Sequence, residues 1–556
     1  MLTRSNLSWK LPPAVLLLVC LALWSSTASA APGSGGKAPG PCGSALLKQL
    51  NPVQDRPYLG PVPGGRGFPT VGETRKFWTY DLSVMPPKNV QVAATCRGVG
   101  DKVAVWIADS EWNKSVVQAD VDAVLSAMEQ ATPRTPDAGV VANNEALFGA
   151  PPKFHEDDPE LTLLVYDIPN YKQYSFDGFF RREDMAPFNA SCANNPMLYC
   201  SNELGMIHVK SLDLGGEYMQ GVIAHEYEHL AHFGKDPKEE NWLDETLAEL
   251  AMAYSGYEDL GNVEAYLKQP SLALVMEPPV NYGACFVFGG YLYQRLGLAG
   301  IKALTASPAT GIAAVDEAES HGGFESMLGE YAAANILDDP SVADGQFGYD
   351  LFDLGEFSSN DFDNYNGKDF IVQPTGLQYF DLAKPLVGLE TYQLTFDAKG
   401  TSVRAHAVHS AGPAVYPLPA GEPVTLPVLA QPSLVLALAN PDPDTKATVS
   451  ISVEVVVGEL PVVEEPVVDE SVEDDALTLV EGSPETVADS IPSVDLTPSA
   501  ESEADVPSGD VGATTADQKK GSGCQAGATS SRGSLVPILL LAAWLVVALR
   551  SRYRSV

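Results

Sequence analysis

The sequence predicts an α+β protein in which a β-rich N-terminal part and a mainly helical middle part are followed by a small all-β sandwich. Short apolar runs separated by Gly and polar residues fill the stretch from Lys76 to Trp112, as expected for strands. Several helical segments are expected between about 210 and 340. Beyond about Gln373, short β-prone runs return between Gly, Pro and Asp residues, which is typical of a sandwich.

The first residues have the features of a signal peptide, which we assign to residues 1–30. An apolar run from Leu11 to Leu23 follows Arg4, and the small residues Ala28 to Ala30 then offer a cleavage site. Residues 31–41 contain only Ala, Pro, Gly, Ser and Lys and are expected to be a linker. The protein is therefore expected to be exported.

Export makes disulfide bonds plausible. Cys192 and Cys200 bracket a short loop that a bridge could close. A second bridge between Cys42 and Cys96 would leave Cys285 unpaired, but the spacing of the cysteines does not fix the connectivity.

The N-terminal folded part, residues 42–210, is expected to mix strands with helix. Strands are expected at Val90–Ala94, Val103–Ile107 and Leu161–Tyr166, which are short apolar runs. A helix is expected from Ser115 to Glu129, where apolar residues recur at helical spacing.

The middle part, residues 211–370, is expected to be helical. One helix should begin after Gly216 and continue to Phe233, because this stretch contains no Pro. Further helices are expected at Asn241–Tyr254, Cys285–Leu296 and Phe324–Ile336.

The third part, residues 371–458, is expected to be a β-sandwich with a structural or targeting role. Its expected strands are Tyr392–Phe396, Val403–Val408, Val424–Val428 and Ala447–Val457.

The first of the middle helices carries His225, Glu226 and His229 in the pattern HExxH. Two His residues four positions apart project from one face of a helix, about 6 Å apart along its axis. Both imidazoles can then reach one zinc ion, the expected cofactor, and Glu226 is placed to take a proton from a metal-bound water.

The next helix offers Glu245 as the third metal ligand. Glu249 lies one turn further along the same face and is placed to orient His225 or His229 through the free ring nitrogen. His232 is a rival third ligand, but it lies about 10 Å along the axis from His225, too far to share one ion with it. His232 is therefore expected to have a structural role or to lie at the rim.

The HEYEH helix and the following WLDETLAE helix resemble the glutamate-zincin metallopeptidases, and in particular the hyicolysin-like group of bacterial neutral zinc peptidases. That group has an LFG element, a GYF-like element and an SNE-like element before the zinc helix. Leu147–Gly149, Gly178–Phe180 and Ser201–Glu203 stand here in that order, so the resemblance spans about residues 75 to 300. It implies a zincin-type metallopeptidase domain with a helical zinc-binding subdomain.

Asn281 to Ala284 precede an apolar helix and resemble the segment of zinc aminopeptidases that supplies a Tyr to the tetrahedral intermediate. This resemblance makes Tyr282 a candidate oxyanion donor, with a Tyr packed at a helix start as the alternative. The chain differs from these zinc peptidases in two respects. Only fifteen residues, 230 to 244, separate His229 from Glu245, fewer than in the relatives. The aminopeptidase motif that captures a substrate N-terminus is not evident, which favours an endopeptidase.

A carboxylate-rich stretch in the middle part is a candidate calcium site, with a polar surface loop as the alternative. Its spacing does not fit the EF-hand loop. The stretch contains Asp361, Asp363, Asn364, Asn366, Gly367 and Asp369.

Residues 459–523 carry seventeen acidic residues and two Lys, a net charge of −15, and are expected to be a disordered acidic stalk. This stalk accounts for much of the chain's formal charge of −38, a charge that argues against a nucleic-acid partner. Residues 524–556 combine Cys524, an apolar stretch from Leu535 to Leu549 and a basic end. They resemble the C-terminal sorting tag of myxobacterial surface proteins, and a plain membrane anchor is the alternative.

The sequence therefore predicts a zinc metallopeptidase that cleaves proteins or peptides. It is expected at the cell surface or anchored in the outer membrane, in contact with the membrane through its tag, with release from the cell as the alternative. The alternative to an enzyme is an inactive surface protein that keeps the zincin fold and binds a partner. A zinc hydrolase acting on other bonds is a further alternative.

Overall fold

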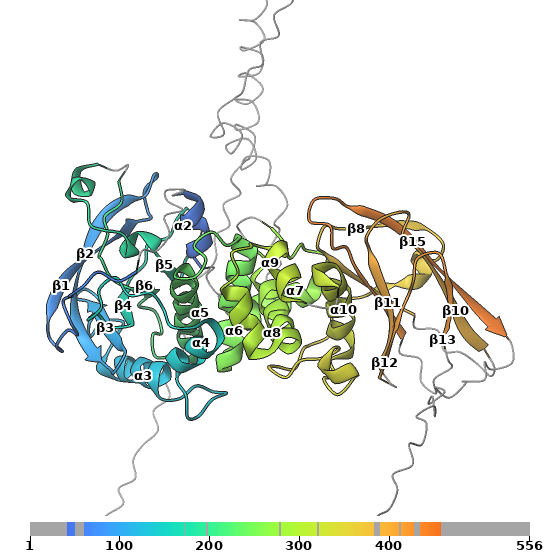
Figure 1. The fold of residues 1–556 in the computed structure, drawn as a ribbon, viewed down its shortest axis with the longest axis horizontal. Coiled ribbons are helices and arrows are strands. Elements are labelled where there is room, and N and C mark those ends of the chain that lie inside the picture. The colour runs from blue at the N-terminus through green and yellow to red at the C-terminus, as the bar shows by residue number, and fades with distance from the viewer. Residues whose placement is uncertain are drawn as a thin grey trace, which may run out of the picture. The chain divides into compact units, whose positions relative to one another are not determined.

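The structure is a computed structural model, and it describes residues 42–50 and 60–457. Within the second range it leaves out 173, 196–197, 277–279, 320–321, 383–389, 411–412 and 427–433. The described residues belong to one compact unit that mixes helices and sheets, so the α+β prediction is confirmed (Figure 1). The predicted signal peptide, linker, acidic stalk and sorting tag lie outside the described residues. Within that described part, none of the helices has the length and apolarity needed to span a membrane.

The N-terminal part is built on a six-stranded mixed sheet with the strand order β1-β2-β3-β4-β6-β5. The three strands β3, β4 and β6 are parallel, whereas the other neighbours pair antiparallel. Every residue of β3 and β4 is buried, as is usual for parallel strands covered on both faces. The strands are β1 (Thr74–Asp81), β2 (Lys88–Val99), β3 (Val103–Ala108), β4 (Leu161–Tyr166), β5 (Gly178–Phe180) and β6 (Met206–Lys210).

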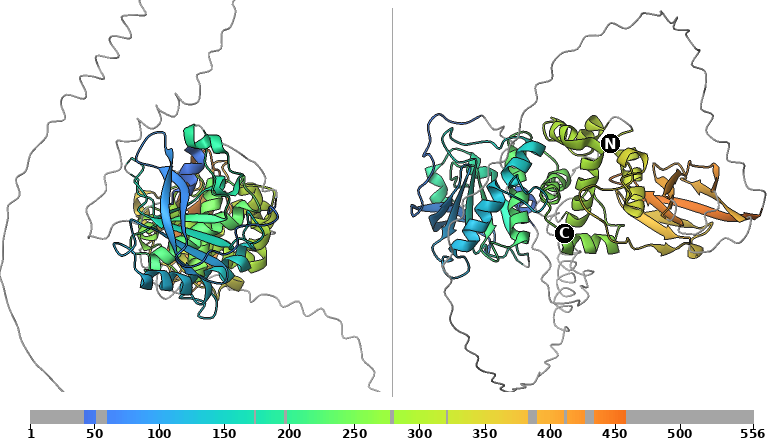
Figure 2. Two further views of the ribbon diagram at one scale, coloured as in Figure 1. Left: turned by 90° about the vertical axis from the view of Figure 1, so that its left-hand side faces the viewer. Right: turned by 90° about the horizontal axis from the view of Figure 1, so that it is seen from below.

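Helices cover one face of this sheet (Figures 1 and 2). They are α3 (Gln118–Glu129), α4 (Val140–Phe148) and α5 (Glu217–Phe233), and their apolar residues share one core with the sheet. A second core on the other face contains Phe77, Trp106 and Phe179, and Leu47 of the short helix α2 (Ser44–Leu50) packs into it. The β5 strand lies at the edge of the sheet, next to α5 and α2.

The middle part is helical, as predicted. The predicted helices appear as α5, α6 (Asn241–Ser255), α8 (Tyr282–Thr305) and α10 (Gly323–Leu337). Helices α4, α7 (Leu260–Lys268) and α9 (Ile312–Ala318) were not predicted. Helix α6 ends at Ser255 and is followed by Gly256, whose φ of 85° suits a glycine in the left-handed region. Helix α8 is interrupted at Gly297. Short 3-10 turns lie at Arg182–Met185, Ala190–Asn194, Ala343–Gly345 and Phe362–Asn364.

The last part consists of two sheets with a shared core, in agreement with the predicted sandwich (Figure 2). Their strands pair antiparallel, except that β7 and β9 pair in parallel. One sheet has the order β13-β10-β15-β8 and the other β12-β11-β14-β9-β7. Helix α10 contacts β11 and β14. The strands are β7 (Asn360–Asp361), β8 (Asp369–Val372), β9 (Leu377–Asp381), β10 (Glu390–Asp397), β11 (Arg404–His409), β12 (Ala414–Pro417), β13 (Pro423–Leu426), β14 (Leu434–Ala439) and β15 (Ala447–Val457).

The sandwich begins earlier than the predicted boundary at residue 371. Strand β8 starts at Asp369 and pairs with β15, and β7 pairs with β9. Both strands are too short to form an apolar run, so only their hydrogen-bonded partners identify them.

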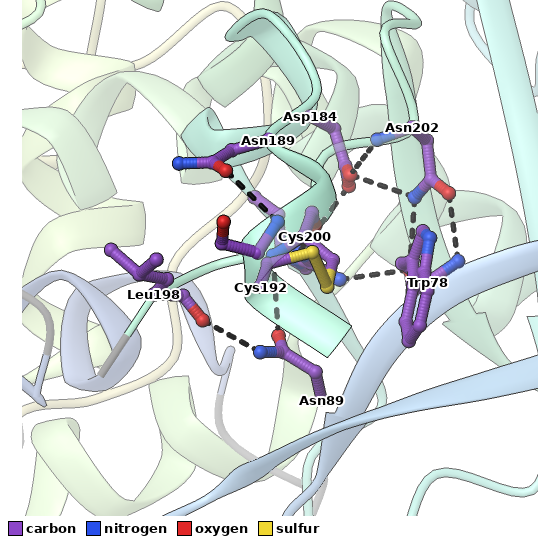
Figure 3. Close-up of a disulfide and its surroundings, with 10 residues drawn as sticks. Trp78, Asn89, Asp184, Asn189, Cys192, Leu198, Cys200 and Asn202 are labelled. Atoms are coloured by element: carbon purple, nitrogen blue, oxygen red, sulfur yellow. Dashed lines mark hydrogen bonds and ion pairs between the residues drawn. A yellow bond between two sulfur atoms is a disulfide. The ribbon is translucent and has the colours of Figure 1, made fainter. Parts of the chain in front are cut away.

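The predicted short loop is closed by a disulfide between Cys192 and Cys200 (Figure 3). The side chain of Asn89 in β2 holds the same loop, because it donates to Leu198 O at 2.7 Å and accepts from the backbone of Cys200 at 3.4 Å. The second disulfide considered from the sequence, between Cys42 and Cys96, is not formed. Cys96 is buried in β2, and Cys42 lies at a different place in the fold.

Candidate metal centre

Two packed helices bring the predicted metal ligands together. Helix α5 supplies His225 and His229, and α6 supplies Glu245 from the opposite side. Glu245 Oε2 lies 3.1 Å from His225 Nε2 and 3.6 Å from His229 Nε2. All three side chains are buried. The packing of α5 against α6 therefore brings together His225, His229 and Glu245, the three metal ligands predicted from the sequence.

These side chains fit a divalent metal ion. In a tetrahedral site with bonds of about 2.0–2.2 Å, the nitrogen and oxygen ligand atoms lie about 3.4 Å apart, close to the distances between Glu245 and the two imidazoles. The other oxygen of Glu245, Oε1, is buried and has no hydrogen-bond partner among the described residues. Burying a carboxylate without full pairing is costly, and a bound cation would offset that cost.

Cys42 is a fourth donor in the same place. Its Sγ lies 3.5 Å from His229 Nε2, and the four donor atoms of Cys42, His225, His229 and Glu245 all lie within 4.8 Å of one another. Sequence reasoning considered Cys42 only as a partner in a disulfide bond. The two parts of the chain are 187 positions apart, and no local pattern connects them.

Buried or half-buried carboxylates contact the other ring nitrogen of each histidine. Glu249 Oε1 lies 3.4 Å from His225 Nδ1, the contact predicted for it. Asp244 Oδ1 and Glu228 Oε2 each lie 3.5 Å from His229 Nδ1, and sequence reasoning missed both of these acids. Such contacts fix the orientation of an imidazole whose other nitrogen binds a metal.

His232 lies outside the group of donor atoms around His225. Its Nδ1 is 3.2 Å from Asp244 Oδ1 and 3.3 Å from Glu228 Oε1, and its side chain is buried. It therefore packs behind the site, where it shares its two acidic partners with His229, and it does not lie at a rim.

Glu226 is buried beside the donor atoms. Burial raises the pKa of its carboxyl group and outweighs the lowering effect of His225 and His229. Its Oε2 accepts a hydrogen bond from Ser44 Oγ at 2.9 Å. Strand β5 passes so close that a Cβ at Gly178 would lie 2.8 Å from Glu226 Cγ, so only glycine fits at this position without a shift.

Tyr282, the first residue of α8, also faces the site. Its ring centroid is 6.3 Å from that of His225, and its hydroxyl donates to the backbone carbonyl of Cys42 at 3.2 Å. Burial and the nearby charge of Glu245 raise the pKa of Tyr282 well above its ordinary value, so the hydroxyl stays protonated and can donate.

The chain before the sheet crosses this site. The backbone N–H of Gly43 donates to Gly178 O in β5 at 3.0 Å, and Ser44 Oγ accepts from the N–H of Phe180 at 2.8 Å. Further on, Lys48 Nζ lies 3.5 Å from Asp244 Oδ2 and donates to the backbone carbonyl of Glu239 at 2.6 Å. Residues 42–50, called here the N-terminal segment, therefore touch β5, α5, α6 and α8.

Residues of the SNE element hold the fold together, and Figure 3 shows Asn202 beside Asp184 and Trp78. Asn202 accepts from Trp78 N at 2.7 Å and donates to Asp184 Oδ1 at 2.7 Å. Asp184 also lies 3.0 Å from His208 Nε2, and Ser201 donates to the carbonyl of Ala186. These contacts tie the loop after β5 to β1 and β6.

The LFG and GFF elements belong to two elements that both contact α5. The first ends α4 with Leu147 and Phe148 buried, and the second is β5 itself. Gly178 of the GFF element lies against Glu226 at the metal centre.

The carboxylate-rich stretch from Asp361 to Asp369 forms no cluster of metal-donor atoms within the described ranges. Asn366 instead bonds in both directions to the backbone of Val453 in β15, at 3.0 and 3.1 Å. The carboxylate of Asp369 pairs with Lys399. These contacts belong to a polar surface turn of the sandwich.

Comparisons with known proteins identify no family for this chain. No family model and no curated protein matches it. Among solved structures, it is similar to the family GH115 4-O-methyl-α-glucuronidase BtGH115A, described as specific for decorated arabinogalactans. The match has 11% identity and a TM-score of 0.12, and it covers 43% of this chain and 39% of that one. A similarity of this size carries no argument about fold or function.

Proposed function

We propose that this chain is a zinc metallopeptidase of the glutamate-zincin type, exported to the cell surface, that cleaves peptide bonds within proteins. The proposal for the metal centre is supported by the converging donor atoms of His225, His229 and Glu245 and by the buried carboxylate of Glu226 beside them. The cell-surface location rests on the sequence of the two ends of the chain.

A bound zinc ion would supply a Lewis acid that polarises a carbonyl group and lowers the pKa of water. Glu226 would accept the proton of the attacking water and deliver it to the leaving amine. Tyr282 would donate a hydrogen bond to the carbonyl oxygen as negative charge develops there.

One observation favours a peptide as the substrate. The chain's own backbone lies across the site, where the carbonyl of Cys42 accepts from Tyr282 and the N–H of Gly43 donates to the edge strand β5. An extended peptide that adds to a sheet edge is held by the same type of hydrogen bond. Tyr282, one of the groups that would act on a peptide bond, thus already contacts a peptide carbonyl.

The test compares the purified full-length chain with Glu226→Gln on a denatured protein substrate, with zinc content measured for each. Because Cys42 lies among the donor atoms, each comparison is made in the natural chain and in Cys42→Ala. Glu217→Gln is the matched control, an exposed residue in the first turn of the same helix.

Chelator-sensitive cleavage that persists in Glu217→Gln and disappears in Glu226→Gln, with about one zinc bound in each, supports the proposal. Zinc binding without cleavage in any of the chains overturns it, and the binding-protein alternative then takes its place.

A further inference from the structure

The N-terminal segment completes a closed set of metal ligands. Catalytic zinc sites keep one position open beside three protein ligands, whereas sites with four protein ligands are closed. For a tetrahedral ion, the sulfur of a Cys ligand lies about 3.6 Å from a ligand nitrogen. Cys42 Sγ lies 3.5 Å from His229 Nε2. The sulfur therefore stands where a fourth ligand belongs.

The same few residues also engage each group proposed to act on a substrate. The hydroxyl of Ser44 bonds the carboxylate of Glu226, and Tyr282 bonds the carbonyl of Cys42. The backbone of Gly43 bonds β5. A substrate peptide cannot take the same positions while the segment is in place, because Glu226 Oε2, the Tyr282 hydroxyl and the Gly178 carbonyl already bond the segment.

The rest of the segment anchors it to the body of the protein. Ala45 and Leu47 are buried, and Leu47 packs in the core that contains Phe179. Lys48 reaches Asp244, the acid that also contacts His229. The segment is thus held by apolar burial and by an ion pair as well as by its contacts in the site.

We propose that Cys42 binds the metal as a thiolate and that residues 42–50 are an internal inhibitor, which must leave the site before a substrate can bind. This inference rests on the proposed peptidase function. When the segment leaves, the bond between the sulfur and the metal would break and the thiolate would take up a proton from the solvent buffer, so neither sulfur nor metal changes its oxidation state.

The first experiment tests the bond to sulfur without using activity. The full-length chain is loaded with Co²⁺ in place of zinc, and its near-ultraviolet absorption is recorded, because a thiolate bound to Co²⁺ gives a charge-transfer band there. The band is expected in the natural chain and in the control Cys96→Ala, whose sulfur lies in β2. It is expected to disappear in Cys42→Ala while one Co²⁺ remains bound. A band that persists in Cys42→Ala, or that is absent from the natural chain, overturns the ligand assignment.

The second experiment tests inhibition, with cleavage of a denatured protein by the zinc-loaded chains. Cys42→Ala is expected to cleave at least about tenfold faster than the natural chain and Cys96→Ala, since a lost ligand worth about 1.4 kcal/mol already gives a factor of ten. Equal or slower cleavage by Cys42→Ala overturns the inhibitory role.

The two proposals fail in different ways. If the Co²⁺ band depends on Cys42 but no variant cleaves any peptide, the peptidase function and the inhibitory role both fall and the four-ligand site stands. If Glu226-dependent cleavage is the same with and without Cys42, the peptidase function stands and the inhibitor proposal falls.

Discussion

The hydroxyl of Ser44 donates a hydrogen bond to Glu226 Oε2 at 2.9 Å while it accepts one from the backbone N–H of Phe180 at 2.8 Å. One side chain thus joins the proposed proton acceptor to the edge strand. A hydrogen bond to a charged group contributes roughly 1.5–3 kcal/mol, so the loss of this contact should favour release of the N-terminal segment.

Ser44→Ala is therefore expected to raise the cleavage rate of the full-length chain by about tenfold. The measurement is the initial rate on a denatured protein, with Ser359→Ala, an exposed Ser of the same type, as the control. An unchanged rate would show that Ser44 does not hold the segment in place.

Tyr282→Phe removes only the hydroxyl that would stabilise the developing charge. In the Cys42→Ala background, kcat is expected to fall by roughly 10²–10³-fold with little change in KM or in bound zinc. Tyr365→Phe in the sandwich is the control. A fall in zinc content that parallels the fall in kcat would instead indicate a role in the structure of the site.

Glu249→Gln removes the negative charge of the carboxylate that contacts His225 Nδ1. The affinity for zinc is expected to fall by about 10–100-fold, because a carboxylate behind a ligating imidazole fixes its orientation and raises its basicity. Competition with a zinc chelator measures this affinity. Glu264→Gln, an exposed residue of α7, should leave it unchanged. Equal affinities in the two variants would refute the positioning role of Glu249.

Gly178→Ala places a methyl group 2.8 Å from Glu226 Cγ and 3.0 Å from Val222 Cγ1. Strand β5 must then move away from α5, and the free energy of unfolding is expected to fall by about 1–3 kcal/mol. Denaturant unfolding measures the loss. Gly355→Ala is the matched control, since its Cβ would meet only the end of the Leu267 side chain, at 3.1 Å. Equal stabilities would mean that β5 adapts without cost.

His406 in β11 makes the stability of the protein depend on pH. Burial, with a smaller effect of the Arg404 charge, lowers the pKa of His406 to about 4. Arg404 is itself paired with Glu325 of α10 at 2.6 Å. Between pH 6.5 and pH 4 the unfolded chain binds a proton at this residue that the folded chain does not, so stability is lost as the pH falls through this window.

His406→Gln removes this proton uptake. On going from pH 7.5 to pH 5, the natural chain is expected to lose about 2 kcal/mol more unfolding free energy than the variant. Denaturant unfolding at the two pH values gives the comparison. Parallel losses would show that His406 titrates in the folded protein as it does in the unfolded chain.

The sequence predicted best those elements whose pattern is local and long. Helix α5 covers the predicted range up to Phe233, because no helix breaker interrupts it and a Gly pair precedes it. Helices α7 and α9 were missed, since nine and seven residues are too few to establish a helical period. The short strands β7 and β8 were missed for the same reason.

At the metal centre, the sequence identified the residues that belong to a known motif and missed those brought in by the fold. His225, His229 and Glu245 follow a spacing that chemistry dictates. Cys42 and Ser44 reach the site through contacts that span more than 180 positions. The residues next to them in the sequence form no motif that predicts these contacts. Asp244 stood beside Glu245 in the sequence, but only the crossing of α5 and α6 shows that it points at His229.

The edge position of β5 has a consequence for the lifetime of the protein in solution. An unpaired strand edge offers free N–H and C=O groups to any neighbouring chain and is a common starting point for aggregation. Residues 43 and 44 occupy these groups at Gly178 and Phe180. The segment therefore also covers the edge of β5. Its departure would open the site to substrates and would at the same time expose this edge to aggregation.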